Sequence, residues 1–535
     1  MPSLSGSGVR AFLTTFIVLT VLPSLAQTDR IEILGVDKLV FDDSIAPGAQ
    51  RLLGNARFKH ADAIMTCDSA YIYEDQTVKA FGRVTISQGD TLRITGHRLD
   101  YSGKDRRASI QGKGETPGTG VVLTNPDMEL TTDALVYELR SRTALYTNGG
   151  TIVSRKENNT LTSKRGLYMA GERAFLFSDA VLLKHPERTI ASDTLRYETA
   201  TGIARFFGPT TITQKDGSTV YCNKGWYDTR KDLARFGRGA RLVGKEQEIS
   251  GDSIHYNRKS GIGEAFGNVA IRDTTNDLLV RGDRAWYDEV HDKSIVTGNA
   301  EMVMLIGGDS LFLHGDSLIA TNAATDSLAG VTSSTGGGRE EARLIRAYHG
   351  VRFFKSDLQG ACDSLVYAES DSLIHMFRSP VLWSGKDQIT GDSVRIALRD
   401  GKAHRLFVRG NAFMASQADS TRYDQVAGST LTGYFNDNEL RTVVAEGNSR
   451  TVYFAKETKE GVERIMGMNT ADCSRIDVAI SSDSTGQAKV HTVSFITQPD
   501  AVLWPLSKAP IEEQLLPGFL WRGGERPTQR EGIFK

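Results

Sequence analysis

The residue types that most often carry chemistry are sparse in this 535-residue chain, which holds four cysteines and ten histidines. No Cys-x-x-Cys or His-x-x-x-His pair occurs, so the sequence lacks the spacing expected of a metal site. The histidines are scattered, and none is placed with a serine or cysteine in a pattern typical of nucleophilic catalysis. We therefore predict no catalytic residue, no metal, no cofactor and no enzymatic activity.

Aspartates, in contrast, recur at one position of a repeated pattern, each directly after a small residue. Such a column could form a ladder that binds Ca²⁺, but the known calcium-binding β-roll has a nine-residue period with paired glycines, which this sequence lacks. An aspartate beside a small corner residue more simply accepts hydrogen bonds from nearby backbone N–H groups. We predict a structural role for these eight residues: Asp68, Asp133, Asp193, Asp252, Asp283, Asp316, Asp363 and Asp392.

The aspartates belong to a tandem repeat that reads aliphatic, any, small, Asp, polar, apolar, any, Tyr. Clear copies are residues 94–101, 249–256 and 280–287. Seven of the twelve gaps between successive small residues are 29 to 31 residues long, so the period is real. The small residues are Cys67, Gly96, Thr132, Ser163, Ser192, Cys222, Gly251, Gly282, Gly315, Cys362, Gly391, Gly428 and Cys473.

A second half-motif lies between these segments and reads glycine, often asparagine, then alternating apolar residues, as in Gly82–Ile86 and Gly267–Ile271. Gly-Asn supplies the positive φ of a tight connection, and the alternation indicates a strand with one buried face. Ile249 has the opposite parity to Ile254 and Tyr256, so the strand must bulge or turn a corner at the small residue between them. Stacked copies predict an all-β fold, an elongated open β-jellyroll built from tandem repeats of about thirty residues.

The tyrosine and aliphatic columns of the repeat share one face of their strands. They are either ordinary core residues or the lining of an open apolar groove, and an exposed apolar surface of that size usually has a ligand. The sequence leaves both interpretations open. The candidates for the groove are Leu99, Tyr101, Leu135, Tyr137, Leu195, Tyr197, Ile254, Tyr256, Tyr287, Leu365 and Tyr367.

The four cysteines all occupy the small-residue position, where other copies carry glycine, serine or threonine. They lie in repeats that are not adjacent, so in a linear stack their Cα atoms lie beyond the ~7 Å that a disulfide can bridge. We predict buried free thiols.

Residues 1–26 are predicted to be a signal peptide, because a single charge, Arg10, precedes the apolar stretch 11–22 and small residues follow at 24–26. The apolar stretch is too short to span a bilayer. The formal net charge of −1, with acids and bases interspersed, gives no reason to expect binding to nucleic acid. The mature protein is therefore expected to be exported and soluble.

The rhythm of the repeat breaks at residues 323–342, which include three consecutive glycines and are predicted to be a linker or long loop. We expect one jellyroll segment at 30–322 and a second at 343–500. Residues 501–535, with four prolines and several charges, are predicted to be an irregular tail.

The repeats resemble the OstA-like family, which includes the periplasmic lipopolysaccharide-transport bridge protein and the N-terminal domain of the outer-membrane lipopolysaccharide assembly protein. The resemblance rests on segments such as Leu53–Phe58 with Met65–Ala70 and Ile389–Val394 followed by Val408–Ala412, and it covers roughly residues 31–500. The family implies a β-jellyroll that joins end to end with homologous rolls, and a groove that takes the acyl chains of lipid A.

The resemblance implies a periplasmic protein that binds and transports lipopolysaccharide, shielding lipid A acyl chains between the inner and outer membrane. Its partners would be other jellyroll components of the transport machinery at the two membranes, and a location at the outer membrane is the alternative to a free periplasmic one. The chain is far longer than the usual bridge protein, which leaves its oligomeric state open.

Two other functions compete with this interpretation. A structural or adhesive envelope protein would use the same repeats without carrying lipid. A β-helix enzyme acting on polysaccharide would have coils of similar length, but it should break the repeat with one cluster of acidic and basic residues, and the sequence shows no such cluster.

Overall fold

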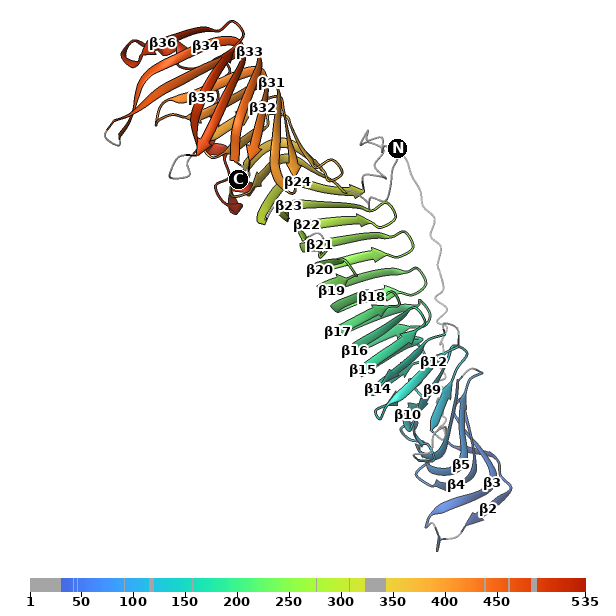
Figure 1. The fold of residues 1–535 in the computed structure, drawn as a ribbon. Coiled ribbons are helices and arrows are strands. Elements are labelled where there is room, and N and C mark those ends of the chain that lie inside the picture. Colours follow the sequence, from blue (N-terminus) through green and yellow to red (C-terminus); the bar gives the residue numbers. More distant parts are fainter. Residues whose placement is uncertain are drawn as a thin grey trace, which may run out of the picture. The chain divides into compact units, whose positions relative to one another are not determined.

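The computed structural model describes residues 30–535 with gaps, and these residues form antiparallel β-strands and short 3₁₀ turns (Figure 1). The predicted all-β fold is confirmed. The predicted signal peptide and the segment 323–342 lie outside the described residues. The gaps are 42, 46, 91, 115–119, 156–157, 276, 307, 323–342, 437–438, 460–461 and 483–487.

The chain divides into two compact units. Unit 1 comprises residues 1–126 and 131–142, and unit 2 comprises residues 127–130 and 143–535. In unit 1, β3 to β7 form successive antiparallel pairs and β10 pairs with β7. The strands of unit 1 are β1 (Glu32–Gly35), β2 (Lys38–Phe41), β3 (Ala49–His60), β4 (Ala63–Tyr73), β5 (Thr77–Gln88), β6 (Leu92–Ser102), β7 (Arg107–Gln111), β8 (Val121–Thr124) and β10 (Ala134–Glu138).

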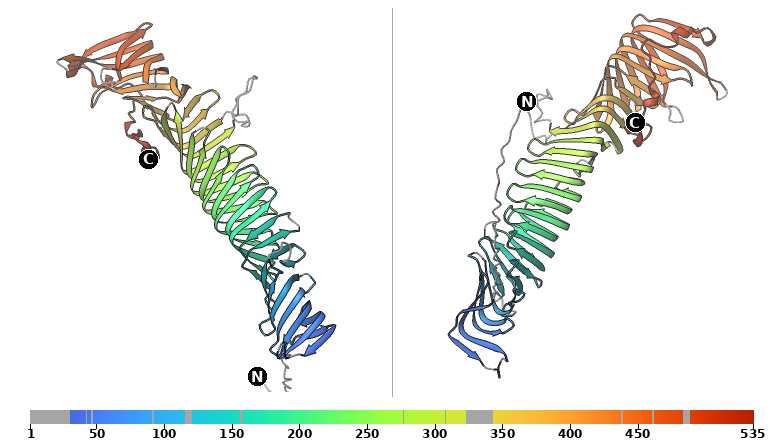
Figure 2. Two further views of the ribbon diagram at one scale, coloured as in Figure 1. Left: turned by 60° about the horizontal axis from the view of Figure 1, so that its bottom comes forward. Right: turned by 180° about the vertical axis from the view of Figure 1, so that it is seen from behind.

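Unit 2 begins in β9 (Met128–Thr132), and most of its long strands pair antiparallel with the next long strand in sequence order (Figure 2). Its first strands are β11 (Thr143–Tyr146), β12 (Gly150–Ser154), β13 (Thr160–Ser163), β14 (Arg165–Met169), β15 (Ala174–His185), β16 (Arg188–Glu198), β17 (Ile203–Gln214), β18 (Thr219–Asp228), β19 (Leu233–Val243), β20 (Gln247–Asn257), β21 (Ile262–Asp273), β22 (Leu278–Asp288), β23 (Lys293–Ile306) and β24 (Asp309–Asn322). They are followed by β25 (Arg343–Phe354), β26 (Gln359–Ala368), β27 (Leu373–Phe377), β28 (Val381–Ser384), β29 (Asp387–Thr390), β30 (Ser393–Arg399), β31 (Lys402–Gln417), β32 (Tyr423–Asn436), β33 (Glu439–Lys459), β34 (Val462–Ser482), β35 (Ala488–Ile496) and β36 (Asp500–Pro505).

The long strands bend at the small residue of the repeat. Between β20 and β21 the register shifts from Ser250 to Ser253, and between β21 and β22 the residues Gly267 and Asn268 face the single residue Asp283. Gly267 and Asn268 have φ of 69° and 48°, the left-handed region that these two residue types tolerate best. The predicted bulge and the positive φ of the Gly-Asn pair are confirmed.

The corner divides each long strand into two halves, and the halves form the two arms of a roll. The first arm consists of the strand halves that precede the small residue, together with the halves of neighbouring strands that pair with them. The second arm consists of the halves that follow the small residue, together with the halves that pair with those. In β20 the first arm holds residues 247–250 and the second arm holds residues 253–257. Ile249 from the first arm and Ile254 from the second line the same cavity, so the arms face each other.

The repeated aspartates join neighbouring corners. Asn268 Nδ2 donates a hydrogen bond to Asp252 at 3.1 Å, and Asn299 Nδ2 donates one to Asp283 at 3.1 Å. In these corners the carboxylate thus takes a side-chain amide from the following strand, where the sequence predicted a local backbone N–H. A Cβ atom at Gly267 would lie 2.2 Å from Asp252 Oδ2, so the aspartate requires glycine there.

The choice of residue at the small position follows from one hydrogen bond. Where the residue is not glycine, its side chain donates to the carbonyl oxygen two residues later: Ser163 Oγ at 2.9 Å, Ser192 Oγ at 3.1 Å and Cys362 Sγ at 3.2 Å. The four cysteines are free, as predicted, with Cys473 half-buried and the others buried. Burial raises the pKa of the Cys362 thiol to about 12, so it stays protonated and unreactive.

The sheet of unit 2 continues on both sides of the undescribed residues 323–342. β24 pairs with β25 from Phe312 opposite Phe354 to Asn322 opposite Arg343, with the usual corner shift in between. The predicted division into segments 30–322 and 343–500 remains a prediction, since the structure does not describe the segment that would separate them.

The C-terminal segment 506–535 packs against unit 2. Gln425, which is buried, donates from Nε2 to Gln514 O at 2.8 Å and accepts at Oε1 from Leu516 N at 2.8 Å. Gln388 makes the same pair of bonds, at 2.7 and 2.6 Å, one step further along the segment. Each glutamine thus gives the segment the donor and acceptor that a neighbouring strand would supply. Of residues 501–535, which the sequence predicts to be an irregular tail, the first five belong to strand β36. The rest contain the 3₁₀ turns η1 (Leu506–Lys508), η2 (Ile511–Glu513), η3 (Gly523–Glu525) and η4 (Arg530–Phe534).

Two arginines fasten the end of this segment. Arg526 Nη2 donates to Gln359 Oε1 at 2.5 Å, and Arg530 donates from Nε and Nη2 to the two oxygens of Glu301, each at 2.7 Å. The Glu301 side chain is only 3% exposed. Burial alone would raise the pKa of Glu301, but the hydrogen bonds from Arg530 and Arg281 hold it below its usual value. The ionised Glu301 therefore depends on its arginine partners.

Aromatic side chains complete this contact. The ring of Phe519 lies 5.0 Å from Tyr423 and 6.2 Å from Phe413, centroid to centroid, and Trp521 lies 5.0 Å from Tyr423. The sheet side chain Trp383, 1% exposed, is among the largest fully buried groups of the protein. The segment 506–535 therefore belongs to the packed structure of unit 2.

Two buried aspartates near this segment should make stability depend on pH. Asp387 and Asp424 lie opposite Ser416 on neighbouring strands, and burial raises the pKa of each to about 6. The folded state therefore holds their protons more firmly than the unfolded state does, and each acid stabilises the fold below pH ~4 and loses that contribution as the pH rises through about 6.

We compare the double variant Asp387→Asn/Asp424→Asn with wild type. As the pH rises from 4.5 to 7, the free energy of unfolding of the variant is expected to increase relative to that of wild type by on the order of 2–3 kcal/mol per acid. Denaturant titrations of both proteins at each pH measure this difference. A constant difference across that range would show that neither carboxyl group has a raised pKa.

Candidate functional site

The space between the arms of unit 2 is hollow. The largest described cavity, of about 460 Å³, lies among strands β16 to β22, within the range of ~300–1,000 Å³ typical of ligand pockets. Branched aliphatic residues form its first-arm wall, and small residues leave room in the second arm. The first-arm residues include Ile190, Ile212, Ile249 and Ile271, and the second-arm residues include Ala234, Ala265 and Ala285.

Further hollows continue along the same unit. A second cavity, of about 80 Å³, shares the lining residues Ile249 and Tyr287 with the cavity of about 460 Å³. A third cavity, of about 240 Å³, shares Leu278 with the second. The third cavity shares Met304 and Tyr367 with a hollow of about 50 Å³ that reaches β31. Because neighbouring cavities share lining residues, they form one connected space from β16 to β31, which we call the slot.

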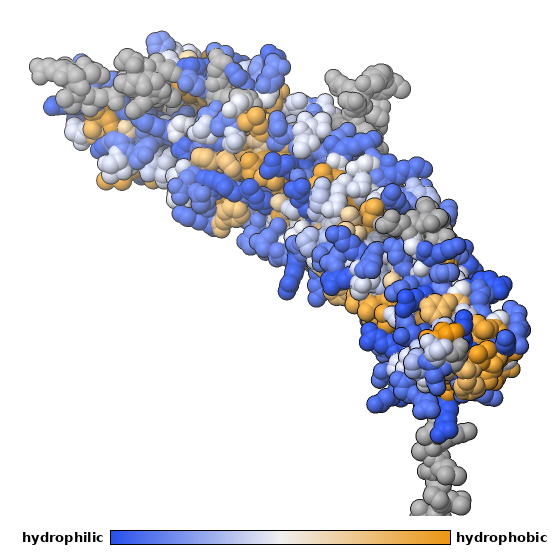
Figure 3. Space-filling view, turned by 90° about the horizontal axis from the view of Figure 1, so that it is seen from below, coloured by the Kyte–Doolittle hydropathy of each residue, from blue (hydrophilic) through white to orange (hydrophobic). Residues whose placement is uncertain are grey.

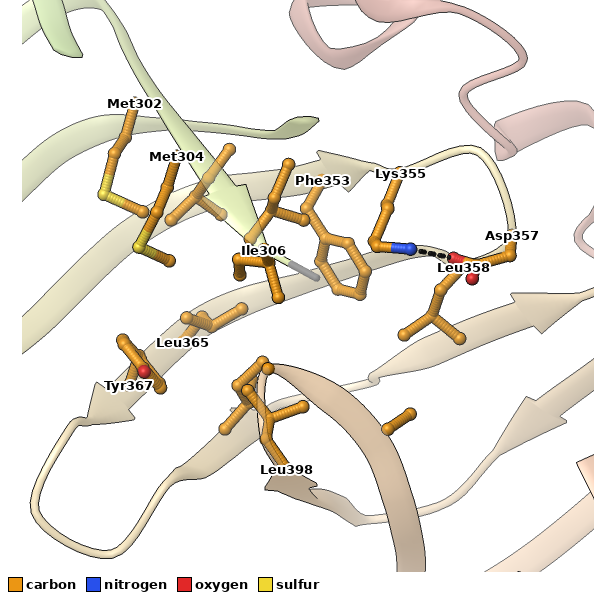
Figure 4. A pocket seen from close by; sticks show the side chains of 15 residues that line it. Met302, Met304, Ile306, Phe353, Lys355, Asp357, Leu358, Leu365, Tyr367 and Leu398 are labelled. Carbon is orange, nitrogen blue, oxygen red and sulfur yellow. Dashed lines mark hydrogen bonds and ion pairs between the residues drawn. The ribbon is translucent and has the colours of Figure 1, made fainter. Parts of the chain in front are cut away.

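The far end of the slot is lined by flexible apolar side chains (Figure 4). Met302, Met304 and Phe353 project into the hollow, where unbranched methionines adapt to ligands of different shape. Lys355 Nζ and an Asp357 carboxylate oxygen, 2.7 Å apart, form an ion pair at the edge. The slot thus combines an apolar interior with charge at its border.

Tyrosines of the repeat stand between the apolar wall and the polar border. Tyr256 OH donates to Glu289 Oε2 at 2.8 Å, and Tyr227 OH donates to Asp232. Burial, followed by the bond to the carboxylate, raises the pKa of Tyr227 to about 12 and raises that of Tyr256 as well. Both phenols therefore stay neutral and protonated. Their rings face the cavity while their hydroxyl groups bind border acids.

The structure places the predicted groove residues in two different environments. In unit 2, residues from several repeats line the hollows: Tyr197, Ile254, Tyr256, Tyr287, Leu365 and Tyr367. Leu195 is fully buried beside them in sequence and lines none of these hollows. Their role in binding stays a prediction.

In unit 1 the same columns are buried. Leu99, Tyr101, Leu135 and Tyr137 are at most 1% exposed, and none of them lines the hollows described above. The hydroxyl of Tyr101 lies 2.5 Å from Nδ1 of buried His60.

The phenol of Tyr137 is also satisfied internally. Tyr137 OH donates to Gln88 Oε1, while Gln88 Nε2 donates to Asp62 at 2.7 Å and to Leu139 O at 3.1 Å. Asp62 is also bound by Arg142 at 2.6 Å. The Tyr137 phenol therefore belongs to a polar network that runs from buried Gln88 to the exposed pair Asp62–Arg142.

Sequence reasoning missed the polar residues at the border of the slot. The cavity of about 460 Å³ is bordered by Arg188, Gln214, Arg258 and Glu289. A signal for one of them exists: His60, Gln88, Gln214 and Asp273 each come six residues after the corner glycine of their strand. These residues end the first-arm strands, where a side chain can reach the opposite arm.

Unit 1 also carries exposed apolar side chains in its first two strands, β1 and β2, each of which pairs with β3. Hydrophobic patches are visible among the hydrophilic surface in Figure 3. An exposed apolar strand at a sheet edge is a typical docking site for another strand. The exposed residues are Ile33, Leu34, Leu39 and Phe41.

Among the residues that the structure describes, no cluster of three or more histidine, cysteine or acidic side chains could hold a metal ion. Within the same part of the chain, no helix is long and apolar enough to cross a membrane. The described chemistry is therefore that of an apolar slot with a polar border.

Comparison with known proteins supports the resemblance seen in the repeats. Residues 28–193 match the family model described as OstA-like protein, which covers the corners from Cys67 to Ser192. Comparison with curated proteins gave no match. The strands beyond residue 193 repeat the corner and arm geometry of the matched part. Residues 28–193 are thus similar to the OstA-like family.

Proposed function

We propose that the chain binds lipopolysaccharide by its acyl chains in the slot of unit 2 and carries it through the periplasm between the inner and outer membrane. The observation that carries this proposal is the apolar, connected hollow from β16 to β31 with charged residues at its border. Such a shape suits an amphiphile whose tails are buried and whose head stays in water.

The energetics favour this use of the slot. Each CH₂ group kept from water contributes about 0.8 kcal/mol, so an acyl chain of about twelve carbons gains on the order of 10 kcal/mol from shielding. Walls from successive repeats offer similar surroundings at each step, which lowers the barrier to movement along the slot. The repeat architecture therefore suits transport better than tight storage.

Partners and location follow from the same proposal. Other jellyroll components of the transport machinery at the two membranes are the proposed partners, and the exposed strands β1 and β2 offer a surface for them. A periplasmic location agrees with the signal peptide predicted at residues 1–26. An association with the outer membrane is the alternative arrangement.

Site-specific photo-cross-linking tests the proposal in cells that make lipopolysaccharide. A photoreactive residue at Tyr256 or Tyr367, in the slot, is expected to cross-link to lipopolysaccharide. The matched control is Tyr221, a tyrosine that is 39% exposed and lies outside the hollows described here. Labelling at Tyr221 equal to that at the slot positions, or no labelling at either slot position, would contradict lipid transport and favour the structural or adhesive alternative.

A further inference from the structure

Polar side chains bridge the mouth of the slot, from the tip of the first arm to the tip of the second. Arg258 Nη1, at the second-arm tip, lies 3.4 Å from Gln214 Oε1 at the first-arm tip. Arg188, in the first arm, donates to Tyr227 OH in the second. Its Nη1 also lies 3.9 Å from Asp232 Oδ1. We call such cross-arm contacts latches.

Two more latches occur in unit 2. Arg173 Nη2 lies 3.0 Å from Asp127 Oδ2, and Arg343 binds Asp273. The partners are 46 and 70 residues apart in sequence, so each latch joins different hairpins and not one turn. The four latches are Asp127–Arg173, Arg188–Tyr227 with Asp232, Gln214–Arg258 and Asp273–Arg343.

Every latch contains one arginine, and each of these arginines lines a hollow of unit 2. Arg188 and Arg258 line the cavity of about 460 Å³, and Arg343 lines those of about 80 and 240 Å³. Arg173 lines a separate hollow of about 110 Å³. Three of the latches therefore lie across the mouth of the slot, and the Asp127–Arg173 latch lies over the separate hollow.

The position of the latches has a consequence for any amphiphile in the slot. If its chains lie between the arms and its head lies in water, the atoms that join head and chains must pass through the mouth. A latch stands across that path. Cargo that moves along the slot must therefore open each latch that it passes.

We propose that these latches are gates, which open in turn as the bulky head of the lipid moves along the mouth and close behind it. This inference rests on the proposed function and adds the residues that control passage. The contact between Arg258 and Gln214 is exposed and therefore breaks easily, so this gate opens thermally. The contact between Arg343 and Asp273 is firmer, because the Asp273 side chain is only 5% exposed.

A removable lock on one latch tests the proposal. The double variant Gln214→Cys/Arg258→Cys is made with the four native cysteines changed to serine, a residue that other repeats carry at the same corner, as at Ser163 and Ser192. A bifunctional maleimide with a reducible centre then joins the two new thiols across the mouth. Circular dichroism of the locked and reduced protein confirms that the fold is kept.

The matched control is Glu248→Cys/Arg272→Cys, which places the same linker between residues opposite each other on β20 and β21, within one arm. Fluorescent lipopolysaccharide is loaded before locking, and its release to unlabelled lipopolysaccharide is followed. The locked latch is expected to slow release at least about tenfold, and reduction of the linker is expected to restore it. The control lock should leave the rate unchanged.

Opening the latch gives the opposite change. Arg258→Ala removes the contact with Gln214 and is expected to speed release by up to about fivefold, the equivalent of about 1 kcal/mol. Equal release from locked and unlocked protein would overturn the gate and leave lipid binding intact. Failure of the unlocked protein to bind lipopolysaccharide would overturn the proposed function itself.

Discussion

A chain that ends after Pro505 is expected to lose on the order of 5 kcal/mol of stability in strands β26 to β34. The segment that is removed supplies Leu506, Ala509 and Leu516, which pack against the buried cluster of Val452, Phe454 and Met468. Losing the packing around one buried aromatic side chain typically costs about 3–5 kcal/mol. Glu301 also loses Arg530, which leaves a buried carboxylate with a single arginine partner in the described contacts.

Urea denaturation followed by circular dichroism measures this effect, and amide hydrogen exchange locates it. A matched control changes only outward side chains of the same segment, Ile511→Ser and Leu520→Ser, which are 83% and 65% exposed. The control is expected to alter stability by less than about 0.5 kcal/mol. If truncation leaves the midpoint unchanged, the segment does not pack against the sheet in solution.

Replacing Gly267 by alanine is expected to destabilise unit 2 by about 3 kcal/mol. Glycine has φ of 69° there, a conformation that costs other residues about 1–2 kcal/mol. The new Cβ would also lie 2.2 Å from Asp252 Oδ2, so the carboxylate must leave its bond with Asn268. Strain and a lost hydrogen bond therefore add together at one corner.

The comparison variant is Gly350→Ala, at a corner glycine with φ of 63° and no heavy atom within 4 Å of its Cβ position. It should cost only the conformational part, about 1–2 kcal/mol. The difference between the two variants in denaturant titrations isolates the contact with Asp252. Equal losses at both glycines would mean that the aspartate does not fix the corner.

Much of the fold could be predicted because it depends on local patterns. The alternation after Gly267 specifies a strand, and the parity change between Ile249 and Ile254 requires a bulge between them. The partner of the repeated aspartate could not be predicted, because Asn268 reaches Asp252 only when two strands pair in one register. Backbone conformation was legible in the sequence, and side-chain partners across strands were not.

The candidate site was predicted in part. The tyrosine column includes Tyr256, Tyr287 and Tyr367, which line hollows, and also Tyr101, which is buried and lines none of the hollows described here, so the binding role of the column stays a prediction. The arginines of the latches, such as Arg258, were not singled out, because their partners lie between 39 and 70 residues away. A charged residue at a turn does not indicate by its type or position which residue of the opposite arm it contacts.

The sequence by itself determined the β-repeat, its corners and the residue types that corners accept, because these follow from backbone conformation and two-residue periodicity within a few neighbouring positions. Only the tertiary structure decided where the roll is hollow and where it is filled, since that depends on the summed volumes of side chains from two facing arms. It also decided that residues 506–535 pack on the sheet, because Gln388, Gln425 and Glu301 find their partners there between 89 and 229 residues further along the chain.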